Sequence, residues 1–259
     1  MRKTVQHLKV IANLRLNDDH HILVLQSADK LEQIHPGQFA NLLVENSSTV
    51  FLRRPFSIYS VDYAQNTISI YIKIIGEGTR ALSKAVVGSE IDTMFPLGNK
   101  FTLPTEKEKV LLVGGGSGVA SLKSLAQSLH EKSNEVAILI GARSSKDLVE
   151  LDEFSKYGTV YTTTEDGTQG VKGYVTNHPV LELELSTFQR VYSCGPEPMM
   201  KAVAKKAKEK SIFCELSLEN TMACGFGVCL CCITTTIDGH KCVCTEGPVF
   251  NINILKWEI

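Results

Sequence analysis

The chain has 259 residues, 43% of them hydrophobic, and its 27 lysines and arginines nearly balance 28 aspartates and glutamates. This composition is typical of a globular protein of two or three small domains. A net charge of −1 argues against nucleic-acid binding, which needs a basic surface. No apolar run is long enough for a signal peptide at the start or for a membrane span elsewhere. We therefore expect a cytoplasmic protein that binds neither nucleic acid nor membranes.

The first hundred residues alternate between short strands and turns. Apolar side chains occupy every second position in parts of 67–75, a period typical of strands. Turn signals at 36–37, 62–66 and 98–99 separate the strands. Several short strands at this spacing predict a small antiparallel barrel, which we assign to residues 1–103.

One segment of the barrel, Arg54-Pro55-Phe56-Ser57, has more specific chemistry. Proline fixes the backbone and cannot donate a ladder hydrogen bond, so we expect the segment at a strand end. The group suits a flavin dinucleotide: Arg54 for the pyrophosphate, Phe56 for packing and Ser57 for the ring edge. Without further context, an exposed arginine beside a core phenylalanine is the better explanation.

A second segment, 76–82, follows the strand that ends at Ile75. Thr79 is expected to cap a short helix, and Gly78 would let the pyrophosphate approach the free N–H groups of that helix. A plain strand-to-helix turn explains these residues as well.

From about residue 109 the pattern changes to alternating strands and helices. The predicted strands are 109–113, 136–140, 159–163 and 190–193, and the predicted helices include stretches near 147–156 and 197–210. This alternation predicts a parallel sheet with crossover helices, whose ligands bind at the carboxyl ends of the strands. We assign residues 104–211 to this α/β nucleotide-binding domain.

A glycine-rich loop follows the first of these strands. It consists of Gly114, Gly115, Gly116, Ser117 and Gly118. Strand, loop and helix N-terminus together predict a phosphate cradle, with a flexible turn as the alternative. The loops 141–144 and 194–199 are expected at the same edge of the sheet. Cys194 begins the latter loop, and its sequence context alone favours a buried strand-end thiol.

All eight cysteines lie in the last quarter of the chain. Cys224, Cys229 and Cys232 are spaced C-x4-C-x2-C and Cys244 follows, which is the plant-type pattern for a two-iron, two-sulfur cluster. The dipeptide at 238–239 predicts a tight hairpin that would bring Cys244 back toward the first three. We assign residues 212–259 to this cluster domain.

Two alternatives to the cluster remain. A zinc site would use two separate C-x2-C pairs, whereas Cys242 and Cys244 are spaced C-x-C. A disulfide framework requires an oxidising compartment, to which nothing in the sequence points. The spacing therefore favours the iron-sulfur cluster over zinc and disulfides.

Taken in order, these motifs resemble the ferredoxin–NADP reductase superfamily. Within it, the strongest resemblance is to the electron-transfer subunits of the NAD-dependent, two-subunit (class 1B) dihydroorotate dehydrogenases. The resemblance covers almost the whole chain and is most specific in the cluster loop and the segment 244–250. Phe56 departs from the tyrosine common in the superfamily, which leaves ring stacking but removes a hydroxyl.

The resemblance implies a fold of three domains and a set of cofactor contacts. FAD would contact Arg54, Pro55, Phe56, Ser57, Tyr71, Ile72, Lys73, Gly78 and Thr79. NAD(H) would bind the α/β domain at the glycine loop, with Cys194 near the site of hydride transfer. The cluster bound by Cys224, Cys229, Cys232 and Cys244 would lie between FAD and a partner subunit.

The implied partner is an FMN-containing dihydroorotate dehydrogenase catalytic subunit of pyrimidine biosynthesis, with two copies of each chain in the complex. A nicotinamide exchanges two electrons as a hydride and a cluster carries one, so a flavin must stand between them. No residue of this chain resembles a base for dihydroorotate. We therefore expect the chain alone to be a diaphorase that needs its partner for orotate formation.

Two rival functions fit parts of the sequence. One is an FAD and iron-sulfur subunit of an NADH-linked ferredoxin:NADP reductase or of a hydrogenase. The other is a zinc-bearing interaction module without enzymatic activity. Partner identity separates the first from our prediction, and visible absorbance separates the second.

Overall fold

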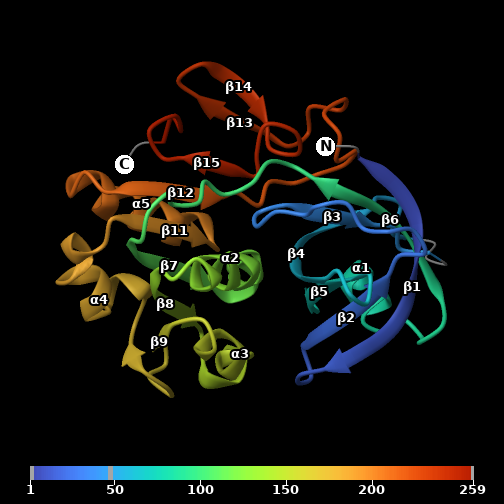
Figure 1. Cartoon of the computed structure of the whole chain (residues 1–259), viewed down its shortest axis with the longest axis horizontal. Helices are drawn as coiled ribbons and strands as arrows, with labels where there is room; N and C mark the ends of the chain where they lie inside the picture. The colour runs from blue at the N-terminus through green and yellow to red at the C-terminus, as the bar shows by residue number, and fades with distance from the viewer. Residues whose placement is uncertain (1–2, 46–48, 258–259) are drawn as a thin grey trace.

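The computed structural model describes residues 3–45 and 49–257. An antiparallel barrel and a seven-stranded sheet with helices on both faces stand side by side, and a small C-terminal lobe lies above their junction (Figure 1). Residues 1–2 and 258–259, at the outer ends of the first and last predicted domains, lie outside the described residues. Within the described part of the chain, no helix is long and apolar enough to cross a membrane.

The predicted barrel is confirmed. Its six strands close in the order β1-β2-β5-β4-β3-β6, with every pair antiparallel. They are β1 (Thr4–Arg15), β2 (His20–Gln26), β3 (Phe39–Leu42), β4 (Arg54–Asp62), β5 (Thr67–Lys73) and β6 (Glu90–Leu97). Alternate side chains such as Leu23 and Ile70 fill the interior, as the period of two requires. The short helix α1 (Glu77–Leu82) packs into the same core through Leu82.

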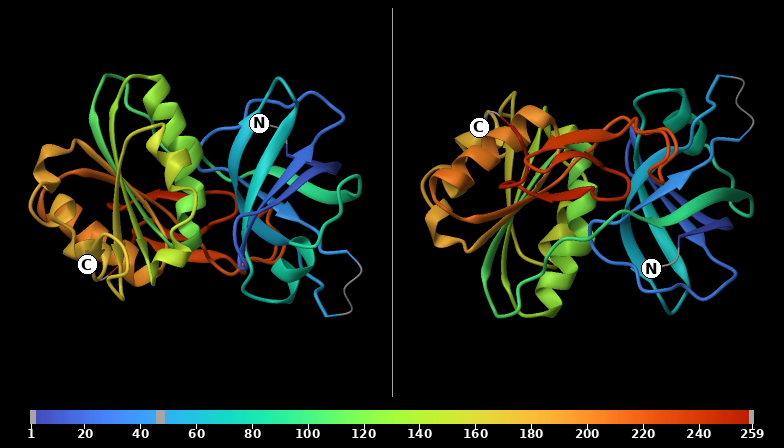
Figure 2. Two further views of the ribbon diagram at one scale, coloured as in Figure 1. Left: turned by 90° about the horizontal axis from the view of Figure 1, so that it is seen from below. Right: turned by 90° about the horizontal axis from the view of Figure 1, so that it is seen from above.

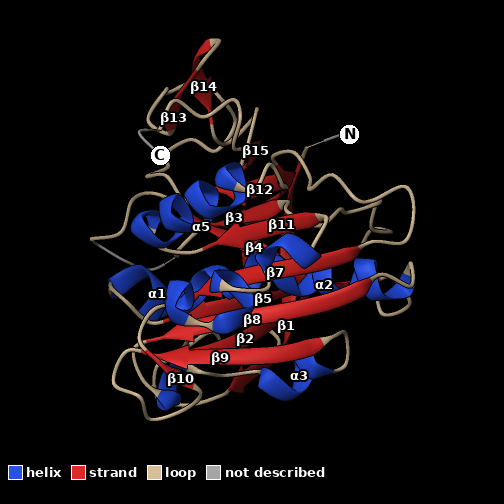
Figure 3. Cartoon of the chain, turned by 90° about the vertical axis from the view of Figure 1, so that its left-hand side faces the viewer, coloured by secondary structure: helices blue, strands red, loops and turns tan. Residues whose placement is uncertain are grey.

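The predicted parallel sheet is also confirmed. Its order is β10-β9-β8-β7-β11-β12-β15, and only β15 is antiparallel to its neighbour (Figure 3). The strands are β7 (Lys109–Gly115), β8 (Glu135–Ala142), β9 (Thr159–Thr164), β10 (Val171–Lys172), β11 (Arg190–Cys194), β12 (Phe213–Ser217) and β15 (Val249–Asn251). The central strands are almost wholly buried, because helices cover both faces.

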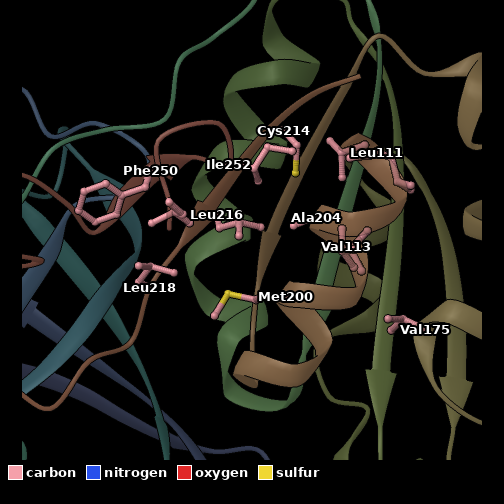
Figure 4. Close-up of a cluster of buried hydrophobic side chains, with 14 of the residues drawn as sticks. Leu111, Val113, Val175, Met200, Ala204, Cys214, Leu216, Leu218, Phe250 and Ile252 are labelled. Carbon is pink, nitrogen blue, oxygen red and sulfur yellow. The ribbon is translucent and has the colours of Figure 1, made fainter. Parts of the chain in front are cut away.

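The helices divide between the two faces of this sheet. They are α2 (Ala120–Glu131), α3 (Leu151–Ser155), α4 (Pro179–Glu182) and α5 (Glu197–Glu209). Helices α2 and α3 share one core with β7 and β8, and α4 and α5 share the other (Figure 4). The helix expected near 147–156 is shorter, because Glu150 has a left-handed backbone with φ +63° and α3 begins only after it.

The C-terminal strands tie the last lobe to the sheet. Leu216 of β12 and Phe250 of β15 pack in the core that also contains Met200 of α5 (Figure 4). Our division at 103/104 and 211/212 stays a prediction. Strand β12 follows the second boundary in sequence yet hydrogen-bonds to β11 within the parallel sheet.

The small lobe contains the predicted hairpin, formed by β13 (Ile233–Thr236) and β14 (Gly239–Cys242). The two connecting residues are Ile237 and Asp238, because Gly239 already pairs with Thr236. Helix α2 lies between the sheet and the barrel and packs against β4 (Figure 2). These contacts bring the barrel, the sheet edge and the cysteine loop together.

Candidate functional site

Arg54 lies at the start of β4 and faces the first turn of α1. A Cβ atom at Gly78 would lie 2.8 Å from the Arg54 Nε atom, so the arginine side chain lies directly against this glycine. The Arg54 guanidinium donates to the backbone carbonyls of Leu52 and Arg53 and, among the described residues, to no carboxylate. Arg53, by contrast, forms an ion pair with Asp92 at 2.8 Å. An arginine without a carboxylate beside a glycine fits a pyrophosphate.

Thr79 does not cap α1 in the way we expected. Gly76 is the N-cap residue and Thr79 lies in the first turn, where its hydroxyl accepts hydrogen bonds from the N–H groups of Ile75 and Gly76 at 2.9 and 3.1 Å. The side chain therefore fixes the chain entering the helix. It leaves the first N–H groups of the helix itself for another partner.

The remaining predicted flavin residues lie on β4 and β5. Ser57 is half-buried on the face of β4 opposite the core, while Phe56 packs against the barrel core. Ile72 is fully buried inside the barrel, so only its backbone can contact a cofactor. Tyr71 already contacts another aromatic side chain. Its ring lies 5.9 Å from that of Tyr59, a residue that our sequence analysis did not single out.

Lys73 connects the barrel to the α/β domain. Its Nζ atom forms an ion pair with the Asp147 carboxylate at 3.0 Å. Although burial acts in the opposite direction, the hydrogen bond from Lys73 holds the pKa of Asp147 below its usual value. Tyr59 also crosses this junction, through a hydrogen bond from its hydroxyl to Glu150 at 2.9 Å. The predicted strand 71–73 thus lines the contact between the two domains.

The three predicted loops meet at one edge of the sheet. Gly114 pairs with Cys194, and a Cβ at Gly118 would lie 2.5 Å from the Gly195 nitrogen. Gly118 is therefore required by the close approach of two backbones. Gly116 differs, because it has φ +54° and a Cβ there would meet no described atom within 4 Å. This open position, before the N-terminus of α2, is where a phosphate could approach the backbone.

Cys194 lies at the carboxyl end of β11 and is fully buried. Its sulfur is 3.7 Å from the Glu219 Oε1 atom, and the hydroxyls of Ser121 and Ser217 also hydrogen-bond to it. Burial and the neighbouring carboxylate raise the pKa of Cys194 well above its usual value. The thiol therefore stays protonated at neutral pH.

Glu219 is a residue that sequence reasoning missed. The residue is exposed to solvent, and its Oε1 atom lies 3.7 Å from the buried sulfur of Cys194. Partial removal of water from the carboxyl group raises the pKa of Glu219. The position directly after β12, at the same sheet edge as the loops, is the signal that could have identified it.

The four predicted cluster cysteines all lie in the C-terminal lobe, three in the loop 224–232 and Cys244 just after β14. The Cys244 N–H group lies 3.4 Å from the Cys232 sulfur, and both residues are buried. Cys224 is half-buried and Cys229 is exposed. Although burial opposes the effect, N–H groups of the loop, including that of Phe226 at 3.5 Å, lower the pKa of Cys224 to about 6. A loop that favours the thiolate suits a metal-bound sulfur.

The sulfurs are arranged in two pairs. The thiols of Cys224 and Cys229 lie close enough to interact with each other, and so do those of Cys232 and Cys244. Over residues 3–45 and 49–257, no three histidine, cysteine, aspartate or glutamate side chains gather closely enough to hold one metal ion. A tetrahedral zinc site needs four ligands around one ion, whereas each iron of a two-iron cluster takes two. The donor set fits the two-iron cluster better.

Two family models match the chain. Residues 219–256 match the iron-sulfur cluster binding domain of dihydroorotate dehydrogenase B, and residues 112–205 match the oxidoreductase NAD-binding domain.

Curated relatives match over nearly their whole length. Proteins named dihydroorotate dehydrogenase B (NAD(+)), electron transfer subunit, are 36% identical in Shouchella clausii and 38% identical in Bacillus velezensis. The matches cover 97% and 94% of this chain and 98% and 96% of those proteins.

Solved structures share the fold. An NADH-dependent reduced ferredoxin-NADP oxidoreductase has a TM-score of 0.87 at 28% identity, over 98% of this chain and 91% of that one. A ferredoxin reductase of carbazole 1,9a-dioxygenase has a TM-score of 0.71 at 22% identity, over 82% and 67% of the two chains, and supports the fold alone.

Proposed function

The chain belongs to the family of dihydroorotate dehydrogenase B electron transfer subunits, and on that premise we propose how its residues pass electrons between NAD and a dihydroorotate dehydrogenase partner. Its cofactors are FAD and a two-iron, two-sulfur cluster, and NAD(H) is its substrate. When bound, FAD exchanges a hydride with the nicotinamide and single electrons with the cluster.

The observation that carries the proposal is the pairing of the four cysteine sulfurs beside the barrel. We assign Cys224 and Cys229 to one iron and Cys232 and Cys244 to the other, because the Cys244 N–H group lies 3.4 Å from the Cys232 sulfur and the thiols of each pair lie close enough to interact. Cys231 and Cys242 lie outside both pairs. Cys232 and Cys244 face the core shared with the barrel, whereas Cys224 is half-buried and Cys229 is exposed.

The flavin residues of the barrel divide into binding and shaping groups. Arg54 binds the pyrophosphate, with Gly78 allowing its approach and Thr79 holding the turn. Pro55 and Ser57 present the outer face of β4 to the isoalloxazine ring, and Phe56 supports that strand from the core. Tyr71, Ile72 and Lys73 contribute the backbone of β5 and the contact to the α/β domain.

The nicotinamide nucleotide takes the edge of the parallel sheet. The glycine loop from Gly114 through Ser117 receives its phosphates, because Gly116 has open space around it. Gly118 shapes the loop through its contact with Gly195. Cys194 and Glu219 would lie next to the bound nicotinamide ring, and the protonated thiol would add no charge there.

The partner is a dihydroorotate dehydrogenase catalytic subunit, and we propose that it contains FMN and assembles with this chain as two copies of each. Apolar side chains on the cluster loop support a docking surface there. Phe226, Val228 and Leu230 are 46%, 73% and 60% exposed and follow one another around Cys229. Large exposed apolar groups in one short loop mark an interaction surface.

The test is anaerobic reconstitution of the chain followed by NADH titration with and without the partner. Alone, the chain should reduce an artificial dye and its own cluster but should not oxidise dihydroorotate. With the FMN-containing partner, dihydroorotate-dependent reduction of NAD should appear. If the reconstituted chain bound neither FAD nor iron, the proposal would be contradicted.

One second function has specific support. The solved NADH-dependent reduced ferredoxin-NADP oxidoreductase matches this chain over 98% of its length. A partner with several clusters and no dihydroorotate activity would favour that function. Copurification of the native complex, with its flavins identified, distinguishes the two.

A further inference from the structure

A buried asparagine on the barrel faces the cluster loop without a hydrogen-bond partner. Asn41 lies on β3 and has no exposed surface. Neither its Nδ2 nor its Oδ1 atom has a partner among the described residues. Buried amide groups are nearly always hydrogen-bonded, because losing water without replacement costs free energy. Because both polar atoms of the Asn41 side chain are unpaired within the described part of the chain, we expect another group to bind next to it.

The direction of the side chain follows from the strand. Ala40 and Leu42 face the barrel core, so Phe39 and Asn41 face outward. On that outward face, Phe39 belongs to the same buried cluster as Cys232 and Cys244. Asn41 therefore faces the cysteine lobe.

A second contact places the amide against the cluster loop itself. A Cβ atom at Gly225 would lie 2.5 Å from Asn41 Nδ2. Gly225 has φ +79° and directly follows Cys224, whose sulfur accepts from the Phe226 N–H. The Nδ2 group thus lies against the backbone that directly follows the first cysteine, with its N–H bonds still unpaired over residues 3–45 and 49–257.

We propose that Asn41 donates an N–H hydrogen bond from Nδ2 to a sulfur of the cluster and thereby raises the cluster's reduction potential. The inference rests on the proposed ligation by Cys224, Cys229, Cys232 and Cys244. The reduced cluster carries one more negative charge, so a hydrogen-bond donor stabilises it more than the oxidised cluster. Asn41 also pairs with Pro55 across β3 and β4, so the same strand pair connects the flavin segment to the cluster.

The first experiment measures the cluster's midpoint potential in N41L, which keeps a similar volume but has no donor. We expect the equilibrium constant for one-electron reduction to fall about tenfold, or about 59 mV, with the FAD potential unchanged. The matched control is N134L. Asn134 is also buried, but it lies between α2 and β8, where its amide bonds to the Leu129 carbonyl and the Glu108 N–H group. Its loss should therefore leave the cluster potential unchanged.

A second measurement does not depend on the variant folding. In wild-type protein with ¹⁵N-labelled asparagine side chains, pulsed electron paramagnetic resonance of the reduced cluster should detect a coupled ¹⁵N nucleus. Absence of that coupling, an unchanged cluster potential in a fully loaded N41L, or a shift of the FAD potential alone would each overturn the proposal. A failure of the proposed four-cysteine ligation can be distinguished from a failure of the Asn41 proposal, because in that case the wild-type protein itself would contain no cluster.

Discussion

The nucleotide edge and the cluster loop of this molecule are held in place by different means. At the nucleotide edge, β7 and β11 are paired on both sides, and backbone contacts at Gly115 and Gly118 fix the loops. The stretch 219–232, all of it described, contains no helix or strand. Its side chains converge mainly through the cysteines.

The comparison shows which region depends on its cofactor. Sheet hydrogen bonds and two apolar cores can maintain the nucleotide edge without a ligand. The cluster loop has no core of its own and exposes large apolar side chains, so ligation by iron must supply much of its order. Loss of the cluster should therefore disturb one region and spare the other.

The sharpest test of this difference is Cys244→Ser. Because Cys244 is one of the two buried cysteines among the four proposed cluster ligands, its loss should abolish the cluster signals and electron transfer to the partner, while NADH-to-dye activity stays within about twofold. Visible absorbance, iron content and dye reduction measure the three effects. The control is Cys231→Ser, an exposed cysteine outside the two pairs, which should keep its cluster. Loss of dye activity in Cys244→Ser would show that the regions are not independent.

The converse change is Arg54→Ala, on the flavin side. Losing a charge-assisted contact to pyrophosphate should weaken FAD binding by about tenfold to a hundredfold and reduce both dye and partner activity. Flavin fluorescence during dilution measures the release. Arg80→Ala removes an exposed arginine on α1, the helix that faces Arg54, and should bind FAD normally. Equal retention in both variants would refute the role of Arg54.

Cys194→Ala should separate hydride transfer from the later steps. Removing the buried thiol leaves the nicotinamide less well placed, so flavin reduction by NADH should slow by roughly tenfold to a hundredfold. Stopped-flow absorbance follows this step, while FAD content and cluster signals should match those of the unaltered chain. An unchanged rate would mean that Cys194 is only a core residue.

Val228→Asp tests the exposed face of the cluster loop. A charge in the proposed interface should weaken partner binding by about tenfold, near 1.4 kcal/mol, without loss of either cofactor. Sedimentation or calorimetry measures the affinity. Leu183→Asp changes an equally exposed apolar residue on the α/β domain and should bind the partner normally. Identical effects of the two changes would rule out a specific surface.

The smallest expected effect concerns thiol reactivity. Burial raises the pKa of Cys194 and of Cys214, so both remain protonated at neutral pH and should become reactive only as the pH rises toward those raised values. Peptide mapping after brief alkylation of cluster-loaded protein should find Cys231 modified and these two intact. Rapid modification of Cys194 at neutral pH would contradict its buried, protonated state.

Hydrophobic periodicity was sufficient to predict the barrel and the parallel sheet, because each strand shows its burial in its own sequence. The cysteine spacing and the glycine loop were visible for the same local reason. Glu219 and Asn41 were not, since their significance arises from neighbours distant in sequence, at Cys194 and Gly225. The role of Thr79 also depended on its position in the helix, which propensity alone locates only within a few residues.

The relay from nicotinamide to flavin to cluster is tested most directly by rapid mixing with NADH, comparing complete protein with protein that has its cluster but lacks FAD. We predict that in the complete protein flavin absorbance bleaches first and the reduced-cluster signal follows. In FAD-depleted protein the cluster should stay oxidised, and it should become reducible again after FAD is restored. Reduction of the cluster by NADH at an undiminished rate without FAD would contradict the account.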